Sequence, residues 1–485
     1  MTRKTRRIIF YIFLTFFIIL AYVAVLYSQG YTFDWQKKSL VMTGAFYFKS
    51  HPKEADIYIN NEYSGKTTKF IKRLTPEEYD IKISKPEYHD WQKTLEIESK
   101  LVTEAKDIIL IRKNLLLNKI TKDYNVKYFS LSNDKKKIVY LTDKATNYSQ
   151  LALRLIDLAE RTDEQIYPAP FFAKNGAGFT PVLPNLSNLL KISWSLNNER
   201  LLLSFSNNRY YILNLRDQSK IIDFNNLIRV LSNYKVYSIK NLSFHPQNSN
   251  KVYFYSKNNL YFIELNNSNL YESSIFSIIS DILTYKIHKN KILYIKYSDG
   301  GFYKTNLEAS SFKKIFDIPF FPAQDWIIPG QEPEQDIEVF SDEILMVAHN
   351  LYLFNYQTQI FEKIVADVEN IEFSNDGRKL IWNTKQEIGV IWLEPESRQS
   401  MREKYETEII IKIFEEINQA FWYSRTNQHI IFVVGDEIKI IELDGRDRRN
   451  IMDIFSIKNS RVFYNEENAK LYVLNEEQLF EIDLD

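Results

Sequence analysis

The sequence contains no cysteine, which excludes disulfide bonds, thiolate nucleophiles and Cys-ligated zinc sites. Its six histidines are dispersed, and no two have the spacing that builds a metal site on a helix or in a His-x-His pair. With only 12 glycines, the chain has no phosphate-binding loop, no dinucleotide fingerprint and no Gly-x-Ser-x-Gly motif. We therefore predict a non-enzyme, with no catalytic residue, no cofactor-binding residue and no metal ligand.

Charge of one sign is not in excess, since 62 Lys and Arg residues balance 62 Asp and Glu residues. Arg3, Lys4, Arg6 and Arg7 precede the first apolar segment, so the rest of the chain is slightly acidic. Binding to nucleic acid requires concentrated Lys and Arg, so the composition predicts that nucleic acid is not a partner. With 45% hydrophobic residues, the 485-residue chain has enough apolar material for several folded cores.

An apolar segment without charge, residues 8–27, follows the basic N-terminus. As a helix it is long enough to cross the hydrocarbon core of a bilayer, which is about 30 Å thick. The cations before it place the N-terminus in the cytoplasm by the positive-inside rule, and the bulk of the chain outside. A cleaved signal peptide would have a shorter apolar run and a small-x-small cleavage site. We therefore predict that residues 1–30 are a cytoplasmic stub and an uncleaved, single-pass anchor in the cell membrane.

Short runs of alternating apolar and polar residues follow the anchor, which is typical of half-buried β-strands. Asn60 and Asn61 tolerate positive φ, so they predict a hairpin turn after residue 59. The pattern as a whole predicts a compact antiparallel sandwich or sheet. We expect its strands at residues 45–48, 57–60, 79–84, 94–98 and 107–111.

Residues 41–113 resemble the PEGA domain, a small β-module of bacterial envelope proteins. The motif residues are Ser50-His51-Pro52, Ala55, Ile57, Ile59, Asn61, Gly65-Lys66-Thr67, Leu74-Thr75-Pro76, Tyr79, Ile81, Ile83 and Tyr88. Two positions depart from the family pattern: Glu54 stands where glycine is usual, and Glu77-Glu78 replaces the usual Pro-Gly. The resemblance implies an interaction or spacer module that contacts envelope protein or polymer.

An internal repeat fills residues 114–485. A strand of apolar or aromatic residues that ends, with variation, in Asp, Asn or Glu and then Leu recurs eight times, and the copies lie 37 to 57 residues apart. This spacing brackets the roughly 40 to 50 residues of a four-stranded propeller blade. The repeat predicts an all-β fold with a β-propeller, of eight blades or of seven. The eight copies end at Leu158, Leu215, Leu265, Leu307, Tyr356, Leu393, Leu443 and Leu484.

A turn followed by a strong strand precedes most copies, most clearly at residues 374–382 and 132–140. Asp and Asn side chains bond to their own backbone in such turns, and Gly377 accepts positive φ. These segments resemble the WD-like repeat of Tol-type periplasmic propellers, in which Ser-Pro-Asp-Gly precedes the strand; Asn375 and Asn133 stand at the proline position. We predict that Asp376 is a turn former and has no role as an acid catalyst.

The last repeat ends at Leu484, so the last blade lacks an outer strand. Closed rings avoid exposed sheet edges, and we therefore expect residues 115–120 to pair with this blade. Two proline-rich segments interrupt the repeat, and loops that carry exposed aromatic residues are common recognition sites in propellers. The alternative is that these aromatics plug the ring or fill gaps between blades. The predicted partner surface consists of Phe171, Phe172, Phe320, Phe321 and Trp326.

These features predict a membrane-anchored binding or scaffold protein outside the cytoplasm, in the bacterial cell envelope. Its propeller is expected to engage an envelope protein or a cell-wall polysaccharide. The alternative is a surface hydrolase, either a glycosidase or a peptidase, with acidic residues at the propeller channel. Fold alone does not separate the two, because one fold hosts many activities.

Overall fold

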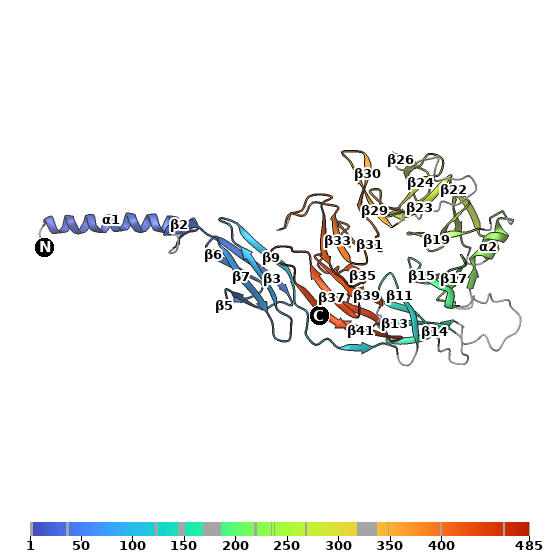
Figure 1. Ribbon diagram of the computed structural model, residues 1–485, viewed down its shortest axis with the longest axis horizontal. Coiled ribbons are helices and arrows are strands. Elements are labelled where there is room, and N and C mark those ends of the chain that lie inside the picture. The colour runs from blue at the N-terminus through green and yellow to red at the C-terminus, as the bar shows by residue number, and fades with distance from the viewer. Residues whose placement is uncertain are drawn as a thin grey trace. The chain divides into compact units, whose positions relative to one another are not determined.

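The computed structural model describes residues 3–34, 38–121, 125–143, 151–167, 186–217, 221–233, 235–236, 238–266, 269–317, 337–347, 349–397, 400–458 and 461–484. Helix α1 (Arg3–Ser28) is a single uninterrupted helix at the N-terminal end (Figure 1). It is long and apolar enough to cross a membrane, and none of its side chains is buried among the described residues. A short hairpin of β1 (Tyr31–Asp34) and β2 (Ser39–Met42) follows, which the sequence pattern did not predict.

The small β-domain, residues 44–109, is a sandwich of two sheets in the orders β6-β3-β9 and β5-β4-β7-β8. Its core lies between the sheets and includes Phe46, Phe48, Ile57 and Ile83. The prediction of a sandwich is confirmed, but its purely antiparallel form was wrong because β3 and β9 pair in parallel. The strands are β3 (Gly44–His51), β4 (Asp56–Ile59), β5 (Glu62–Lys66), β6 (Lys69–Leu74), β7 (Glu78–Ser84), β8 (Trp91–Glu96) and β9 (Val102–Ile109).

The predicted Asn-Asn hairpin is confirmed. Asn60 and Asn61 have φ of 49° and 66°, and they connect the antiparallel strands β4 and β5. Two positive φ values in succession match the right-handed twist of the flanking strands, and asparagine reaches them more readily than most residues. The side chain of Asn60 also accepts a hydrogen bond from the Asp80 N–H at 2.9 Å, which fastens the turn to β7.

The chain divides into two compact units. The first contains α1, the small β-domain and the sheets built from residues 370–473 and 481–485; the second contains residues 119–369 and 474–480. Five four-stranded antiparallel sheets follow in chain order in the second unit. Their strands are β11 (Val126–Leu131), β12 (Lys137–Thr142), β13 (Ala152–Asp157), β14 (Thr162–Tyr167), β15 (Leu189–Trp194), β16 (Arg200–Phe205), β17 (Tyr210–Asn214), β18 (Ile221–Asp223), β19 (Lys240–Phe244), β20 (Lys251–Ser256), β21 (Asn259–Glu264), β22 (Ser274–Ser280), β23 (Ile282–His288), β24 (Lys291–Lys296), β25 (Gly301–Asn306), β26 (Lys313–Asp317), β27 (Ile337–Val339), β28 (Ile344–Val347), β29 (Asn350–Asn355) and β30 (Ile360–Val365).

Three more four-stranded sheets come from the C-terminal part of the chain, in the orders β31-β32-β33-β34, β35-β36-β37-β38 and β10-β41-β40-β39. Each predicted repeat strand is the third strand of its sheet, counted along the C-terminal chain for the last one. The strands are β31 (Asn370–Phe373), β32 (Lys379–Asn383), β33 (Glu387–Trp392), β34 (Thr407–Lys412), β35 (Ile417–Trp422), β36 (His429–Val434), β37 (Glu437–Glu442), β38 (Ile451–Ser456), β39 (Arg461–Asn465), β40 (Lys470–Asn475), β41 (Gln478–Asp483) and β10 (Leu117–Lys119).

Successive sheets pack face to face, as strand β36 shows. All six of its residues are buried. Ile430, Phe432 and Val434 contribute to one apolar cluster, shared with β33, whereas Ile431 and Val433 contribute to another, shared with β40 and β41. A strand covered on both faces reads as a continuous apolar run, which explains its sequence. Such stacking of four-stranded sheets is the organisation of a β-propeller. That the sheets form eight blades of one closed ring stays a prediction.

The expected partner strand of the last repeat is present. Strand β10 pairs with β41, and the Ile120 N–H donates to the Leu479 carbonyl at 2.8 Å. Leu115 and Leu117 pack against the apolar cluster that contains Ile482 and Leu484. The N-terminal segment therefore covers the edge of β41, which would otherwise be open to pairing. A single helix longer than one turn, α2 (Phe224–Leu231), interrupts the sheets of the second unit; 3-10 turns lie at Leu186–Asn188 and Leu270–Glu272.

The predicted turn role of Asp376 is confirmed. Its carboxylate accepts hydrogen bonds from the Ser374 hydroxyl at 2.6 Å and from the Arg378 N–H at 3.1 Å, while Gly377 has φ of 67°. Burial raises the pKa of Asp376, but these hydrogen bonds and the nearby cations outweigh burial and hold the pKa below its usual value. The charged form therefore stabilises the tight connection between β31 and β32.

Replacement of Asp376 by alanine should lower the free energy of unfolding by about 1 to 2 kcal/mol, because two hydrogen bonds to a charged acceptor are lost. Asp134 makes the same contacts with Ser132 and Lys136 between β11 and β12. Asp134→Ala should therefore cost a similar amount, which urea denaturation of both variants measures. An unchanged transition in either variant would contradict the equivalence of the two turns.

Candidate binding site

Strand β8 lies at the edge of the sheet β5-β4-β7-β8, and its inward residues are Trp91, Lys93 and Leu95. All three are buried. Trp91 and Leu95 belong to the core of the small β-domain, so the lysine between them interrupts an apolar alternation. A buried lysine needs several hydrogen-bond partners, since an unpaired ammonium group in the interior is costly.

The ammonium group of Lys93 is enclosed by the loop after β37, residues 443–450. It donates to three backbone carbonyls, those of Asp444, Arg446 and Arg448, each at 2.7 Å. It also lies 3.0 Å from a carboxylate oxygen of Glu442, and its side chain has 0% exposure. These contacts satisfy the three donors of the ammonium group and fix the loop around it. Lys93 therefore joins the small β-domain to the sheet β35-β36-β37-β38.

The same loop also covers the free backbone edge of β8. The Asn450 amide donates to the Gln92 carbonyl at 3.1 Å and accepts from the Gln92 N–H at 3.4 Å. A carboxylate oxygen of Asp447 accepts from the Thr94 N–H at 2.9 Å. Side chains thus replace a neighbouring strand at alternate residues of β8, and the edge is closed to further pairing there.

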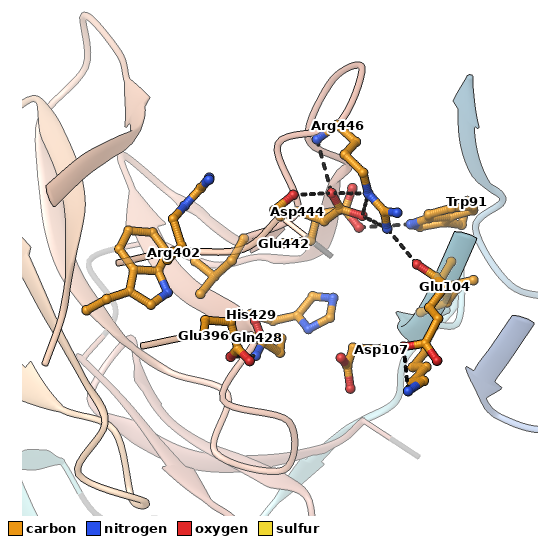
Figure 2. Close-up of a pocket in the computed structure, with 16 residues that line it drawn as sticks. Trp91, Glu104, Asp107, Glu396, Arg402, Gln428, His429, Glu442, Asp444 and Arg446 are labelled. Atoms are coloured by element: carbon orange, nitrogen blue, oxygen red, sulfur yellow. Dashed lines mark hydrogen bonds and ion pairs between the residues drawn. The ribbon is translucent and has the colours of Figure 1, made fainter. Parts of the chain in front are cut away.

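Glu442, in the last position of β37, is the acceptor at the centre of the junction (Figure 2). The Trp91 indole N–H donates to one of its oxygens at 2.9 Å, and the Asn450 N–H donates to the other at 2.7 Å. Together with Lys93, these donors compensate the burial of the Glu442 carboxylate, which is 5% exposed as a residue. Trp91 and Glu442 therefore lock the core of the small β-domain to the end of β37.

A second charged contact lies beside the first. The Arg446 guanidinium binds both carboxylate oxygens of Asp444, at 3.0 and 2.7 Å, and donates to the Glu104 carbonyl on β9 at 2.8 Å (Figure 2). Burial would raise the pKa of Asp444, but the hydrogen bonds and charge of Arg446, with the charge of Lys93, hold that pKa below its usual value. The loop thus contacts both sheets of the small β-domain.

His429, the first residue of β36, is paired in register with Glu442 and is 2% exposed. Its Nδ1 atom lies 3.1 Å from the Thr426 hydroxyl. Burial lowers the pKa of His429 to about 3, although the Asp444 carboxylate acts in the opposite direction. His429 is therefore neutral at physiological pH. Figure 2 shows its ring pointing into the space between Glu442 and Asp107.

That space is a small cavity of about 70 Å³, lined by residues of β9, the loop after β37 and the start of β36. Small-molecule sites in proteins usually enclose about 300 to 1,000 Å³, whereas one water occupies about 30 Å³ in the liquid. The cavity therefore has room for water-sized groups only. The described residues contain no group of three or more His, Asp or Glu side chains placed to hold a metal ion. We interpret the junction as a structural lock, not as a catalytic centre.

Comparison with known proteins supports the division of the chain into parts. Residues 43–107 match the model of the PEGA domain family. The resemblance of this segment to PEGA domains, expected from its motif residues, is thereby confirmed. No curated protein sequence matches the chain.

Several solved structures with propellers resemble the fold. The β-propeller domain of Cps50 (Swd1) from Myceliophteria thermophila is 10% identical, with a TM-score of 0.39, over 77% of this chain and 99% of that domain. The Dos1 propeller is 12% identical, with a TM-score of 0.44, over 76% of this chain and 94% of its own. The dihydro-heme d1 dehydrogenase NirN is 11% identical, with a TM-score of 0.40, over 67% of this chain and 66% of its own.

The partner surface predicted from the sequence cannot be placed beside this junction. Phe171, Phe172, Phe320, Phe321 and Trp326 all lie outside the described residues. The junction itself was not predicted, since Trp91 and Glu442 are 351 positions apart in the chain. One local signal was available: a lysine at an inward position of an otherwise apolar strand indicates a buried charge partner.

Proposed function

We propose that the chain is a non-catalytic scaffold protein of the bacterial cell envelope, anchored in the membrane through residues 8–27. In this proposal, residues 1–30 form the cytoplasmic stub and anchor, residues 41–113 the PEGA-like module and residues 114–485 the propeller. The propeller binds an envelope protein or a cell-wall polysaccharide outside the cytoplasm.

The observation that carries the proposal is the apolar surface of α1. A helix of 26 residues with no buried side chain among its described residues exposes apolar groups that only a lipid or protein environment would shield. Arg3, Lys4, Arg6 and Arg7 at its start favour a cytoplasmic N-terminus. At its other end, the Arg73 guanidinium lies 3.7 Å from the ring of Tyr27, which favours a short and ordered transition from the helix to the small β-domain.

The junction supports a display role. Lys93 and Trp91 hold the small β-domain against the sheet β35-β36-β37-β38, so a force or orientation set at the anchor is transmitted to that sheet. A flexible linker would not do this. A scaffold benefits from such a connection because a fixed binding surface loses less conformational entropy when a partner binds.

Protease added to cells tests the topology. With different epitope tags at the two ends, protease added to intact cells, or to spheroplasts if an outer membrane is present, should remove the C-terminal tag and spare the N-terminal one. Lysed cells should lose both tags. A C-terminal tag that is protected until lysis would overturn the proposed location, and a mature N-terminus near Gln29 would show a cleaved signal peptide instead of an anchor.

A further inference from the structure

The outer face of the sheet β6-β3-β9 is a second feature of the small β-domain (Figure 1). Phe46 and Phe48 of β3 point into the core, so the alternate residues Tyr47 and Lys49 point outward. On the neighbouring strands, Phe70 of β6 and Glu104 of β9 are the register partners of Tyr47. A row of side chains with an aromatic pair therefore crosses the sheet.

The two rings form the floor of a groove. The ring centroids of Tyr47 and Phe70 are 6.4 Å apart, and Phe70 is 41% exposed. The groove has a volume of about 520 Å³, far more than the cavity at the junction, and Val102 completes its apolar part. Side-by-side exposed aromatic rings on a sheet lose contact with water when a ligand with flat apolar faces covers them.

Cations surround this floor. The Lys72 ammonium lies 5.2 Å from the Phe70 ring, the Lys106 ammonium lies 5.9 Å from the Tyr47 ring, and Lys49 lines the groove. The one carboxylate that lines it, Glu104, is 2.5 Å from Lys106, so this pair is neutral as a whole. Lys49 and Lys72 leave an excess of positive charge beside the rings, although the chain as a whole is neutral.

We propose that this face binds a linear anionic polysaccharide. Sugar rings would stack on Tyr47 and Phe70, while carboxylate or phosphate groups on the polymer would contact Lys49 and Lys72. A peptide that adds a strand would use a sheet edge and not this face. A bilayer surface is flat and would contact protruding cations, whereas here the rings lie at the floor of a groove. The inference rests on the proposed function and deepens it, since it names the polymer class that an extracytoplasmic scaffold would meet.

Titration of full-length protein in detergent with a galacturonate hexamer tests the proposal. Binding is expected to weaken by about tenfold in Tyr47→Ala and in Phe70→Ala, because each variant removes a central ring. A Lys49→Gln/Lys72→Gln double variant and added salt should weaken binding as well, since both reduce the charge attraction. The methyl-esterified hexamer, which has the same backbone without charge, should bind less tightly than the charged hexamer.

Two control variants lie outside the groove on β5. Tyr63→Ala removes an equally exposed aromatic ring, and Lys66→Gln removes an exposed cation, so both should bind the hexamer as the unchanged protein does. No binding of the hexamer, equal binding of the esterified form, or unchanged binding by Phe70→Ala and Tyr47→Ala would each overturn the proposal. So would binding of anionic phospholipid vesicles, by nanodisc-embedded protein, that is lost in the same two variants. Because purified protein is used, failure here is distinct from a wrong topology, which only the protease experiment reports.

Discussion

Lys93→Met is expected to weaken the junction by about 3 to 5 kcal/mol, the usual cost of leaving one member of a buried ion pair without its partner. The variant keeps the length and the apolar stem of the side chain but removes the ammonium group. Glu442 would then lose its cation, and the carbonyls of Asp444, Arg446 and Arg448 would lose a donor. Native-state hydrogen exchange at the Gln92 and Thr94 amides measures the free energy of opening at this site.

Lys82→Met is the matched control. Lys82 lies on β7, next to β8, and its ammonium is 2.9 Å from Asp90, but the two side chains are 40% and 31% exposed. Exposed ion pairs contribute only about 0 to 1 kcal/mol, so this variant should leave the exchange of the β8 amides almost unchanged. Equal effects of Lys82→Met and Lys93→Met would contradict the idea that burial makes the junction strong.

The double variant Lys93→Met/Glu442→Gln separates charge from packing. Glutamine removes the uncompensated carboxylate but keeps an acceptor for the Trp91 indole and the Asn450 N–H. Part of the lost free energy should therefore return, whereas the three loop carbonyls remain without their donor. A double variant that opens as readily as Lys93→Met would show that the carbonyl contacts alone determine the strength of the junction.

The repeat strands were predictable because their signal is local. Strand β36 is apolar at every position after His429, and the turn before β32 requires an Asp at one position and a Gly at the next. Both features follow from backbone and burial rules that act within a few residues. The pairing of β10 with β41 was also predictable, since a sheet edge at the end of a repeat array needs a partner.

Strands β5 and β6 were missed, and their side chains explain why. Neither strand has a buried residue, and in β6 Arg73 has φ of 67°, which breaks the alternation between Ile71 and Leu74. Both lie at sheet edges, where one partner strand suffices and apolar patterning is weak. Strand β8 was predicted three residues late, because Gln92 and Lys93 hide the alternation that Trp91 begins.

The junction and the groove were beyond prediction for a different reason. Lys93 meets residues about 350 positions away, and no local pattern tells which distant loop closes around a lysine. Likewise, Tyr47 and Phe70 look like ordinary strand residues until the register places their rings side by side. Tertiary contacts of this kind depend on the whole fold, which the sequence pattern of each strand does not encode separately.

Acid is expected to destabilise the sheet that contains His429. In the unfolded chain the imidazole has its ordinary pKa of 6.5, whereas burial lowers the pKa of the folded protein's His429 to about 3. Between these values the unfolded chain binds a proton that the folded chain does not, so stability is complete above pH 6.5 and falls as the pH decreases. The loss from His429 should reach roughly 2 to 3 kcal/mol at pH 4.5, by about 1.4 kcal/mol per pH unit.

Urea denaturation from pH 7.5 to pH 4.5 measures this loss. His429→Gln should depend less on pH over that range, by about one bound proton, whatever its stability at pH 7.5. His245 and His288, whose pKa values are also lowered by burial, keep part of the pH dependence in both proteins. Thr426→Val is the control, because it removes the hydroxyl next to His429 Nδ1 but retains the imidazole; it should be less stable at every pH with an unchanged slope. A slope that is identical in His429→Gln and the unchanged protein would show that His429 takes up its proton without opening the junction, and the buried neutral imidazole would then play no part in holding it closed.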